Sequence, residues 1–412
     1  MNDIAEAYVR LVLAVGQHDP DYVDAYYGPA DWKAAAERQK RPVVDLLAET
    51  RQLMASIPTP MLAGQSDPLV PPRHDYLRGQ LRAVEGRLRM LQGEKLSFDD
   101  ESKVLYDAVA PVHTAADYER ALRELEPMLP GDGSLIERYD RFRRAFIIPT
   151  DRLARVFDRA IAECRDRTLA HIPLPEGESF RVEYVTDKPW SGYNWYQGQY
   201  HSLIQVNTDL PIYIDRAVDL ACHEGYPGHH VYNLLLEQHL VRQRGWVEYT
   251  VYPLFSPQSL IAEGTANYGI EVAFPEAERM AFERDVLFPL AGLDASRVGT
   301  YYRVQALVDR LAYAGNEAAR GYLNGTLSRP AAIDWLTRYA LMSPPRAEQR
   351  TRFFEKYRSY VINYNLGKDL VKTSIESQAH GAGDRRWSLF AELIASPRLP
   401  GGLQVAGRPW QP

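Results

Sequence analysis

Residues 219–239 read DLACHEGYPGHHVYNLLLEQH and place three of the ten histidines of the chain within eight residues. Apolar residues fill the rest of this stretch, as they do in a buried helix. A His-Glu pair followed by further histidines on a helix is typical of a zinc site whose glutamate is the general base. The stretch therefore predicts a helical metal-binding segment, with His223 as the first ligand and Glu224 as the base.

The second ligand must reach the same ion, and the spacing opposes this in a straight helix. Four residues after the first histidine the chain has Pro227 instead of a ligand. In an ideal helix His229 points about 120° away from the first ligand, and His230 lies about 10 Å further along the axis. A proline lacks the helical N–H, and Gly228 permits unusual dihedral angles. The sequence therefore predicts a kink or bulge at residues 226–228 and favours His229 over His230 as the second ligand.

A third ligand is expected on the following helix, SLIAEGTANYGIEVAF (259–274). Glu263 has small neighbours there, and a carboxylate in such a stretch is costly to bury unless it is paired or binds a metal. Glu271 is the rival ligand on the same helix. Asn267 is expected to hydrogen-bond a ligand histidine. The two histidines and Glu263 predict a site for one Zn²⁺ per chain, since three protein ligands and a water are typical of catalytic zinc.

The rest of the chain reads as mainly helical, with one short β-rich region. FRVEYVTD (180–187) and SLIQVNTD (202–209) show the alternation and β-branched content of strands. The second of these precedes the metal-binding helix, and we expect it to be an edge strand along which an extended substrate aligns. Helical patterns are predicted for the following ranges: 1–56, 75–92, 135–170 and 213–395.

Length and composition agree with a folded globular protein. The chain has 412 residues, of which 45% are apolar and 25% are charged, so intrinsic disorder is excluded. The pattern of elements divides the chain into an N-terminal helical region, residues 1–150, and a mixed α+β metal-binding region, residues 151–412. The predicted fold class is mainly α with a small β-sheet.

Charge and hydropathy exclude several classes of partner. A net charge of −6 argues against a nucleic-acid-binding protein, which normally carries a basic face. No apolar run approaches the ~18 residues that a membrane span needs. The first residues lack the basic region, apolar core and cleavage site of a signal peptide. With only two cysteines, Cys164 and Cys222, a disulfide framework is excluded, and we expect a cytoplasmic location.

Two motifs taken together resemble a known family. HEGYPGHH (223–230) followed by AEGTANYGIE (262–271) resembles the bacterial domain-of-unknown-function 885 family, whose signature is His-Glu-x-x-Pro-Gly-His-His and then a Glu-Gly helix. The resemblance extends to YVDAYYGP (22–29), GQYHSLIQVNTD (198–209) and RSYVINYNLGKDLV (358–371). That family is similar to gluzincin metallopeptidases. The resemblance therefore implies a zincin-like (gluzincin-like) helical metallopeptidase architecture with a His, His, Glu metal set.

The zincin mechanism assigns roles around the predicted metal. Glu224 takes a proton from the metal-bound water and passes it to the leaving amine. One further donor is needed to stabilise the developing oxyanion. The candidates for this donor are Tyr360, Tyr364 and Arg358 of the late motif, with Tyr268 as the runner-up.

The predicted function is a zinc-dependent hydrolase, either a peptidase or an amide hydrolase, acting on a peptide or a small amide. One alternative is a non-catalytic, metal-stabilised binding protein, in which His230 is a fourth ligand and closes the site. The other is a metal-dependent enzyme of different chemistry that uses the same His, His, Glu set. An open coordination position beside Glu224 distinguishes catalysis from a purely structural metal.

Overall fold

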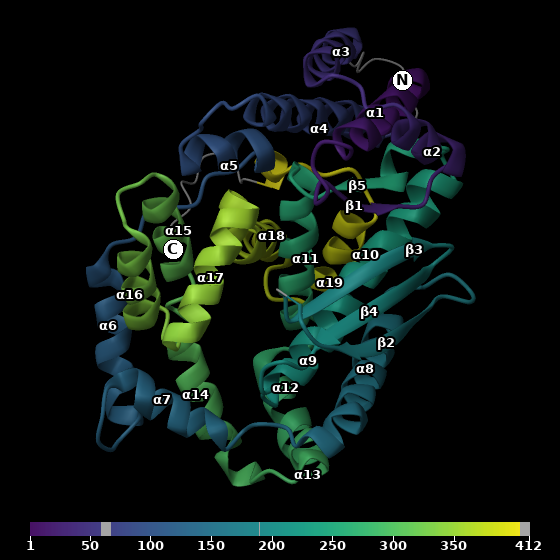
Figure 1. Ribbon diagram of the computed structural model, residues 1–412. Coiled ribbons are helices and arrows are strands. Elements are labelled where there is room, and N and C mark those ends of the chain that lie inside the picture. Colours follow the sequence, from purple (N-terminus) through teal and green to yellow (C-terminus); the bar gives the residue numbers. More distant parts are fainter. Residues whose placement is uncertain (59–66, 189, 404–412) are drawn as a thin grey trace.

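The computed structural model describes residues 1–58, 67–188 and 190–403 of the chain (Figure 1). It is mainly helical with small β-sheets, which confirms the predicted mainly α class. The helices that precede the larger sheet are α1 (Asn2–Val15), α2 (Ala30–Arg38), α3 (Val43–Ser56), α4 (Val70–Leu91), α5 (Phe98–Tyr106), α6 (Ala115–Leu125), α7 (Leu135–Arg144) and α8 (Leu153–Leu169).

The helices that follow the larger sheet supply most of the candidate site. They are α9 (Asp215–Leu220), α10 (His229–Leu236), α11 (Pro257–Ala273), α12 (Glu276–Phe282), α13 (Phe288–Ala291), α14 (Val298–Asp309), α15 (Ala314–Leu323), α16 (Arg329–Tyr339), α17 (Pro344–Tyr357), α18 (Ile362–Ala379) and α19 (Gly383–Ile394).

Two of the predicted helix boundaries were wrong, and prolines explain both. The single helix predicted for residues 135–170 is divided into α7 and α8. Pro149 lies between them, and a proline disfavours helical geometry at the residue before it. Ile147, nearby, forms an isolated β-bridge with Tyr213. Helix α4 begins at Val70, earlier than predicted, because it carries proline in its first turn, where no N–H donor is needed.

The strands form two sheets. Their bounds are β1 (Val23–Tyr26), β2 (Ser179–Val185), β3 (Gly192–Gly198), β4 (His201–Asn207) and β5 (Val251–Pro253). Strands β1 and β5 lie in ranges that were predicted to be helical, so the prediction was wrong for these residues. They pair antiparallel, and the larger sheet has the order β2-β4-β3. Strand β4 is parallel to β2 and antiparallel to β3. The predicted edge position of residues 202–209 was therefore wrong, since β4 is central and β2 and β3 are the edge strands.

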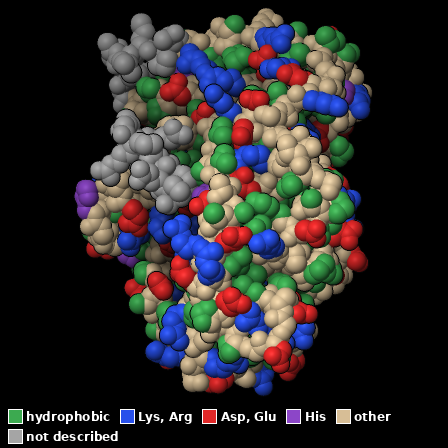
Figure 2. Space-filling model, turned by 90° about the vertical axis from the view of Figure 1, so that its left-hand side faces the viewer, with side chains coloured by type: hydrophobic (Ala, Val, Ile, Leu, Met, Phe, Trp, Pro, Cys, Tyr) green, Lys and Arg blue, Asp and Glu red, His purple; other side chains and the backbone are tan. Residues whose placement is uncertain are grey.

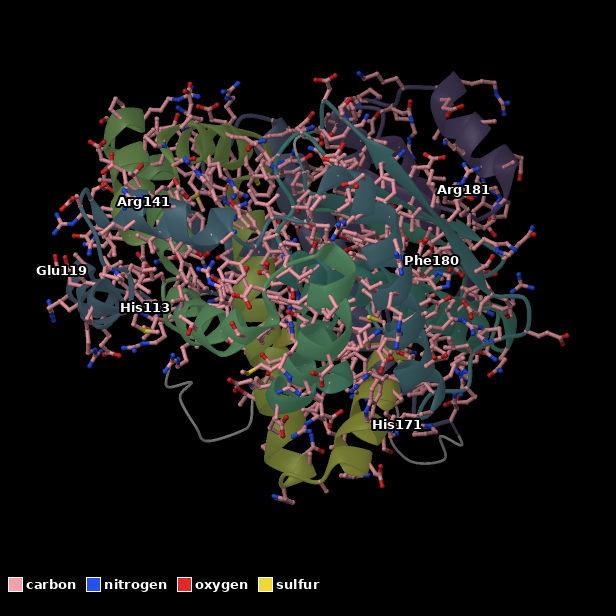
Figure 3. All side chains as sticks on the ribbon, turned by 90° about the horizontal axis from the view of Figure 1, so that it is seen from below. His113, Glu119, Arg141, His171, Phe180 and Arg181 are labelled. Carbon is pink, nitrogen blue, oxygen red and sulfur yellow. The ribbon has the colours of Figure 1, made fainter. Side chains whose placement is uncertain are left out.

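One face of the larger sheet packs on the segment that carries the clustered histidines. The ring centroid of Phe180, on β2, lies 5.0 Å from that of Tyr226 and 5.2 Å from that of His230. The next residue, Arg181, points to the solvent side of the sheet, where it pairs with Glu183 (Figure 3). The alternation recognised in the sequence thus corresponds to an inner and an outer face.

Helices α11 and α18 touch through their backbones. A Cβ atom on Gly264 would lie 2.4 Å from the carbonyl oxygen of Gly367, and a Cβ on Gly367 would lie 2.7 Å from the carbonyl oxygen of Leu260. Only glycine permits this approach. The contact holds α18, and the short 3₁₀ turn η8 (Arg358–Val361) before it, against the helix that carries Glu263.

The main hydrophobic core joins both parts of the chain. It includes Tyr8 and Leu11 of α1 together with Leu260 of α11 and Ile362 of α18, so it draws on residues from both sides of position 150. On the face shown in Figure 2, Lys and Arg side chains are interspersed with Asp and Glu side chains. Among the described residues, no helix combines the length and the apolar character that crossing a membrane requires.

Candidate metal centre

The helix that carries the histidines is interrupted as the sequence predicted. Helix α9 continues as a π-helical turn, η3 (Ala221–Gly225), and α10 begins only at His229. The N–H of Tyr226 donates to the carbonyl of Ala221 (3.1 Å), and the N–H of Gly228 donates to that of Cys222 (2.9 Å). These bonds span five and six residues instead of four. The predicted distortion at residues 226–228 is confirmed.

The tight turn at Gly228 brings two histidines together. A Cβ on this residue would lie 1.9 Å from the carbonyl oxygen of His223 and 2.3 Å from that of Cys222. Because glycine lacks this atom, α10 starts directly beside η3. The rings of His223 and His229 are consequently 4.7 Å apart between centroids and nearly perpendicular, at 88°.

Glu263 of α11 faces this pair. Its Oε2 atom lies 3.3 Å from Nε2 of His223 and 3.8 Å from Nε2 of His229. The same Oε2 atom is buried and has no hydrogen-bond partner among the described residues. An unsatisfied, buried carboxylate oxygen beside two imidazole nitrogens fits a bound cation, because leaving such an oxygen without a partner is costly. The structure therefore brings together all three predicted ligands.

Electrostatics at His229 also suit a metal, whereas the carboxylates of Glu263 and Glu224 raise the pKa of His223 against burial. Burial, and to a smaller extent the charge of His223, lowers the pKa of His229 to about 4. At neutral pH this imidazole is uncharged, which is the form that ligates metal ions. Ligating atoms of His223, Glu224 and His229 lie within 4.8 Å of one another. The set of two histidines with Glu263 and Glu224 has the donor chemistry of a zinc site.

Glu224 is buried beside the ligands and lines the cavity. Burial, followed by the negative charge of Glu263, raises the pKa of Glu224 to about 7 against the lowering effect of His223. Its carboxylate fits against β3, where a Cβ on Gly192 would lie 2.9 Å from Oε1. Asn194, also on β3, donates to the backbone carbonyl of Glu224 at 2.7 Å. The edge strand thus fixes the position of the candidate base.

His230 has a different environment from its neighbour. It is fully buried, its Nδ1 lies 2.8 Å from Oγ of Ser202, and its Nε2 lies 3.0 Å from Oε2 of Glu178. Tyr226 donates to the same carboxylate oxygen at 2.6 Å. With both ring nitrogens engaged, His230 ties the start of α10 to the sheet. This leaves His229 as the histidine that faces His223, and it argues against a closed site with His230 as the fourth ligand.

The late motif contributes one residue that touches a candidate ligand. The hydroxyl of Tyr360 donates to Oε1 of Glu263 at 2.8 Å. Tyr364 lines the cavity, and burial together with the charge of Glu263 raises its pKa well above the usual value. Arg358 lies elsewhere, because its guanidinium pairs with Glu101 of α5 at 2.5 Å and does not line the cavity. Of the three predicted oxyanion donors, only the tyrosines reach the site.

The rivals on α11 have other partners. Glu271 accepts from Lys368 and Lys372 at 2.6 Å each. Tyr268 donates to Glu376 of α18 at 2.6 Å. Asn267 donates to the backbone carbonyl of Glu263 at 2.9 Å and not to a histidine, contrary to the expectation from the sequence.

The site opens into a cavity of about 920 Å³. Helices α14 and α17 lie on one side of it, and α9 with β3 on the other (Figure 1). Asp24, on β1, also lines the cavity and was missed as a site residue. Tyr193 of β3 donates to the carboxylate of Asp24. Burial, together with the charges of Glu263 and Glu224, raises the pKa of Asp24 to about 8. The motif YVDAYYGP, quoted above only for the family resemblance, contained this residue.

Comparison with known proteins supports the fold and leaves the activity open. No family model and no curated protein matches the chain. The fold is similar to that of a "putative lipoprotein" from Colwellia psychrerythraea, with a TM-score of 0.54 and 14% identity over 87% of this chain; the chain spans 65% of the length of that protein.

Two further solved structures are similar at lower scores. One is a "putative lipoprotein of unknown function" from Shewanella oneidensis, with a TM-score of 0.46 and 12% identity over 88% of this chain and 76% of the other. The second is named BsuCP, with a TM-score of 0.48 and 10% identity over 96% of this chain and 89% of the other.

Proposed function

We propose that the chain is a zinc-dependent hydrolase of peptide or small amide substrates with a zincin-like arrangement of its metal ligands. The observation that carries this proposal is the buried Oε2 atom of Glu263, which has no hydrogen-bond partner in the described part of the chain and faces Nε2 atoms of His223 and His229. The resemblance of the two histidine and glutamate motifs to the domain-of-unknown-function 885 family points in the same direction.

A Zn²⁺ held by His223, His229 and Glu263 would lower the pKa of a bound water and polarise the substrate carbonyl. Glu224 is the base in this proposal. Its carboxylate, which lines the cavity beside the candidate ligands, would accept a proton from the water and release it to the leaving amine. Tyr364 is the donor to the carbonyl oxygen, since its side chain lines the same cavity.

Strand β3 orients the substrate in this proposal. It is one of the two edge strands of the larger sheet, and residues 190–195 line the cavity. An extended peptide laid against this edge forms main-chain hydrogen bonds. These bonds position the scissile amide and do not depend on the side chains of the peptide. Gly192 keeps this edge close to Glu224.

The test combines zinc content with activity. Protein purified without a histidine tag is analysed for zinc by mass spectrometry and assayed on a panel of short peptides. We expect about one zinc per chain, loss of zinc in His223→Ala and Glu263→Ala, and retained zinc with about 10²–10⁴-fold slower hydrolysis in Glu224→Gln. Glu271→Gln is the matched control on α11 and should keep both zinc and activity.

Two results would overturn the proposal. Unchanged zinc content in both ligand variants would refute the ligand set. Zinc-loaded wild-type protein that hydrolyses no peptide or amide would favour a structural metal. Near-wild-type turnover by Glu224→Gln, on a substrate that His223→Ala does not cleave, would keep the catalytic metal and place the base elsewhere.

A further inference from the structure

One wall of the cavity carries arginines that form no ion pair with a carboxylate among the described residues. Arg346 and Arg350 lie one turn apart on α17, and Arg143 lies at the end of α7; all three line the cavity. None of the three has an ion-pair partner among the described residues. The Nε atoms of Arg143 and Arg350 are buried and make no hydrogen bond there. A guanidinium with a buried, unpaired donor normally has an anionic partner, and this applies to Arg143 and Arg350, whereas Arg346 is exposed.

The other cations that line the cavity are paired, which makes these three distinctive. Arg216 pairs with Asp219 at 3.1 Å. Lys368 pairs with Glu271 at 2.6 Å. Carboxylates are therefore present around the cavity, yet none of them forms an ion pair with the arginines of α17 and α7 among the described residues.

Stacking leaves the arginine donors free for a ligand. The guanidinium of Arg350 lies 4.4 Å from the ring centroid of Phe353, and that of Arg143 lies 3.8 Å from that of Tyr213. An aromatic ring contacts the face of a guanidinium, whereas carboxylates bind at its edge through two parallel N–H donors. The stacked groups are thus held in place with their edges available.

The electrostatics of the two α17 arginines favour an anion, whereas the pKa of Arg143 is raised, against burial, by Tyr139, Tyr213 and Asp215. Burial lowers the pKa of Arg350. Desolvation also lowers the pKa of Arg346, and the positive charges of Arg143 and Arg216 lower it further. Like charges that are partly desolvated repel each other, and an anion placed between them relieves both costs.

This wall and the candidate metal centre line the same cavity. Arg346 and Arg350 are among its lining residues, and so are Tyr364, Glu224 and Glu263. An anion bound by Arg350 would therefore occupy the cavity into which the candidate metal centre opens.

We propose that Arg350 and Arg346, assisted by Arg143, bind a carboxylate of the substrate, so that the site selects peptides that present a carboxylate close to the scissile amide. This inference rests on the proposed function for the identity of the substrate as a peptide or amide. The carboxylate has two sources in a peptide, the C-terminus and an acidic side chain, and both offer the same bidentate chemistry.

The test measures binding in the absence of turnover. Zinc-loaded Glu224→Gln protein is titrated calorimetrically with three peptides of one length: Ala-Ala-Phe-Ala as the free acid, the same peptide as its C-terminal amide, and Ala-Ala-Phe-Glu as the amide. A charge-assisted bidentate contact predicts that the free acid binds about 10- to 100-fold more tightly than the neutral amide. Tight binding of the glutamate amide would identify the side chain as the source; weak binding would identify the C-terminus.

Variants of α17 assign the effect to the arginine. Arg350→Met keeps the apolar stem against Phe353 and is expected to abolish the preference for the free acid. Arg350→Lys keeps the charge without the planar fork and should restore only part of it. Arg352→Met is the matched control, because Arg352 lies on the same helix with 65% of its side chain exposed and does not line the cavity. It should bind like the parent.

The inference is overturned if the neutral amide binds as tightly as the free acid, if no carboxylate peptide binds, or if Arg350→Met keeps the preference. These failures are distinguishable from failure of the proposed function. Equal kcat/KM of the wild type on free acids and amides refutes the carboxylate site and leaves the hydrolase intact. If the free acid binds preferentially but the wild type turns over no peptide, the hydrolase is refuted and the carboxylate site is retained.

Discussion

Replacing Tyr360 with phenylalanine tests how the carboxylate ligand is held. The hydroxyl of Tyr360 donates to Oε1 of Glu263 at 2.8 Å, and both side chains are buried. The change removes only this hydroxyl and keeps the edge-on ring contact with Tyr106, 6.1 Å between centroids. A hydrogen bond to a charged acceptor contributes about 1.5–3 kcal/mol. At about 1.4 kcal/mol for each factor of ten, the Kd for zinc should rise about 10- to 100-fold. A loss of this size is expected when a residue that orients a metal ligand is removed.

The assay separates metal affinity from the chemical step. The Kd for zinc is measured by competition with a chelator of known affinity, and kcat is measured at saturating zinc. Tyr360→Phe should raise the Kd and leave the kcat of the loaded protein within about threefold of the wild type. Tyr364→Phe removes the same atom from a neighbouring ring, and it should show the opposite pattern. Its zinc Kd stays unchanged, and its kcat falls by about 10²–10³-fold as for a lost oxyanion donor.

The interpretation of Tyr360 as a positioning residue has a clear failure. An unchanged zinc Kd together with a kcat lowered more than a hundredfold at saturating zinc would make Tyr360 itself the oxyanion donor. An unchanged Kd with an unchanged kcat would show that the hydrogen bond to Glu263 contributes nothing to the site.

Three further predictions concern the scaffold. Gly264→Ala should lower the thermal unfolding midpoint by overpacking against Gly367, costing about 1–3 kcal/mol, whereas Gly299→Ala, with no atom within 4 Å of the new Cβ, should not. His230→Ala should retain zinc in metal analysis yet unfold at lower urea, because it loses two buried hydrogen bonds. Burial by itself raises the pKa of Glu178, but hydrogen bonds from His230, Tyr226 and Arg165 outweigh it and lower this pKa from 4.5 to about 2. This stabilisation is present above pH 4.5 and is lost as pH falls towards 2, so the urea midpoint should fall more steeply over this range in the wild type than in Glu178→Gln.

Local chemistry made the centre of the site predictable. Pro227 and Gly228 act on the backbone within one helical turn, so their effect could be inferred without knowing the rest of the fold. The carboxylate on the next helix was identified by the same kind of argument, because its small neighbours indicated close packing. The structure places Glu263 against both histidines.

Residues whose place depends on distant packing were not predictable in this way. Arg358 and Tyr360 are two residues apart, yet one pairs with Glu101 of α5 and the other donates to Glu263 at the candidate metal centre. The separation arises at η8, where Arg358 has a φ of 51° and its partner Glu101 comes from far earlier in the sequence. Asp24 reaches the cavity only because β1 pairs with β5, a contact between distant parts of the chain that no local pattern encodes.

The geometry of the candidate ligands is set largely by two glycines at which the backbone of another segment lies too close for a side chain. Gly228 lets α10 begin against the carbonyls of η3, and Gly264 lets α18 lie directly on α11. Steric exclusion of this kind is stiffer than the packing of flexible side chains, because a backbone contact has no rotamer to change. The two histidines and Glu263 are therefore held together by the fold before any cation binds. In the proposed enzyme, zinc would thus bind to a preorganised site, and its binding energy would not be spent on ordering the ligands.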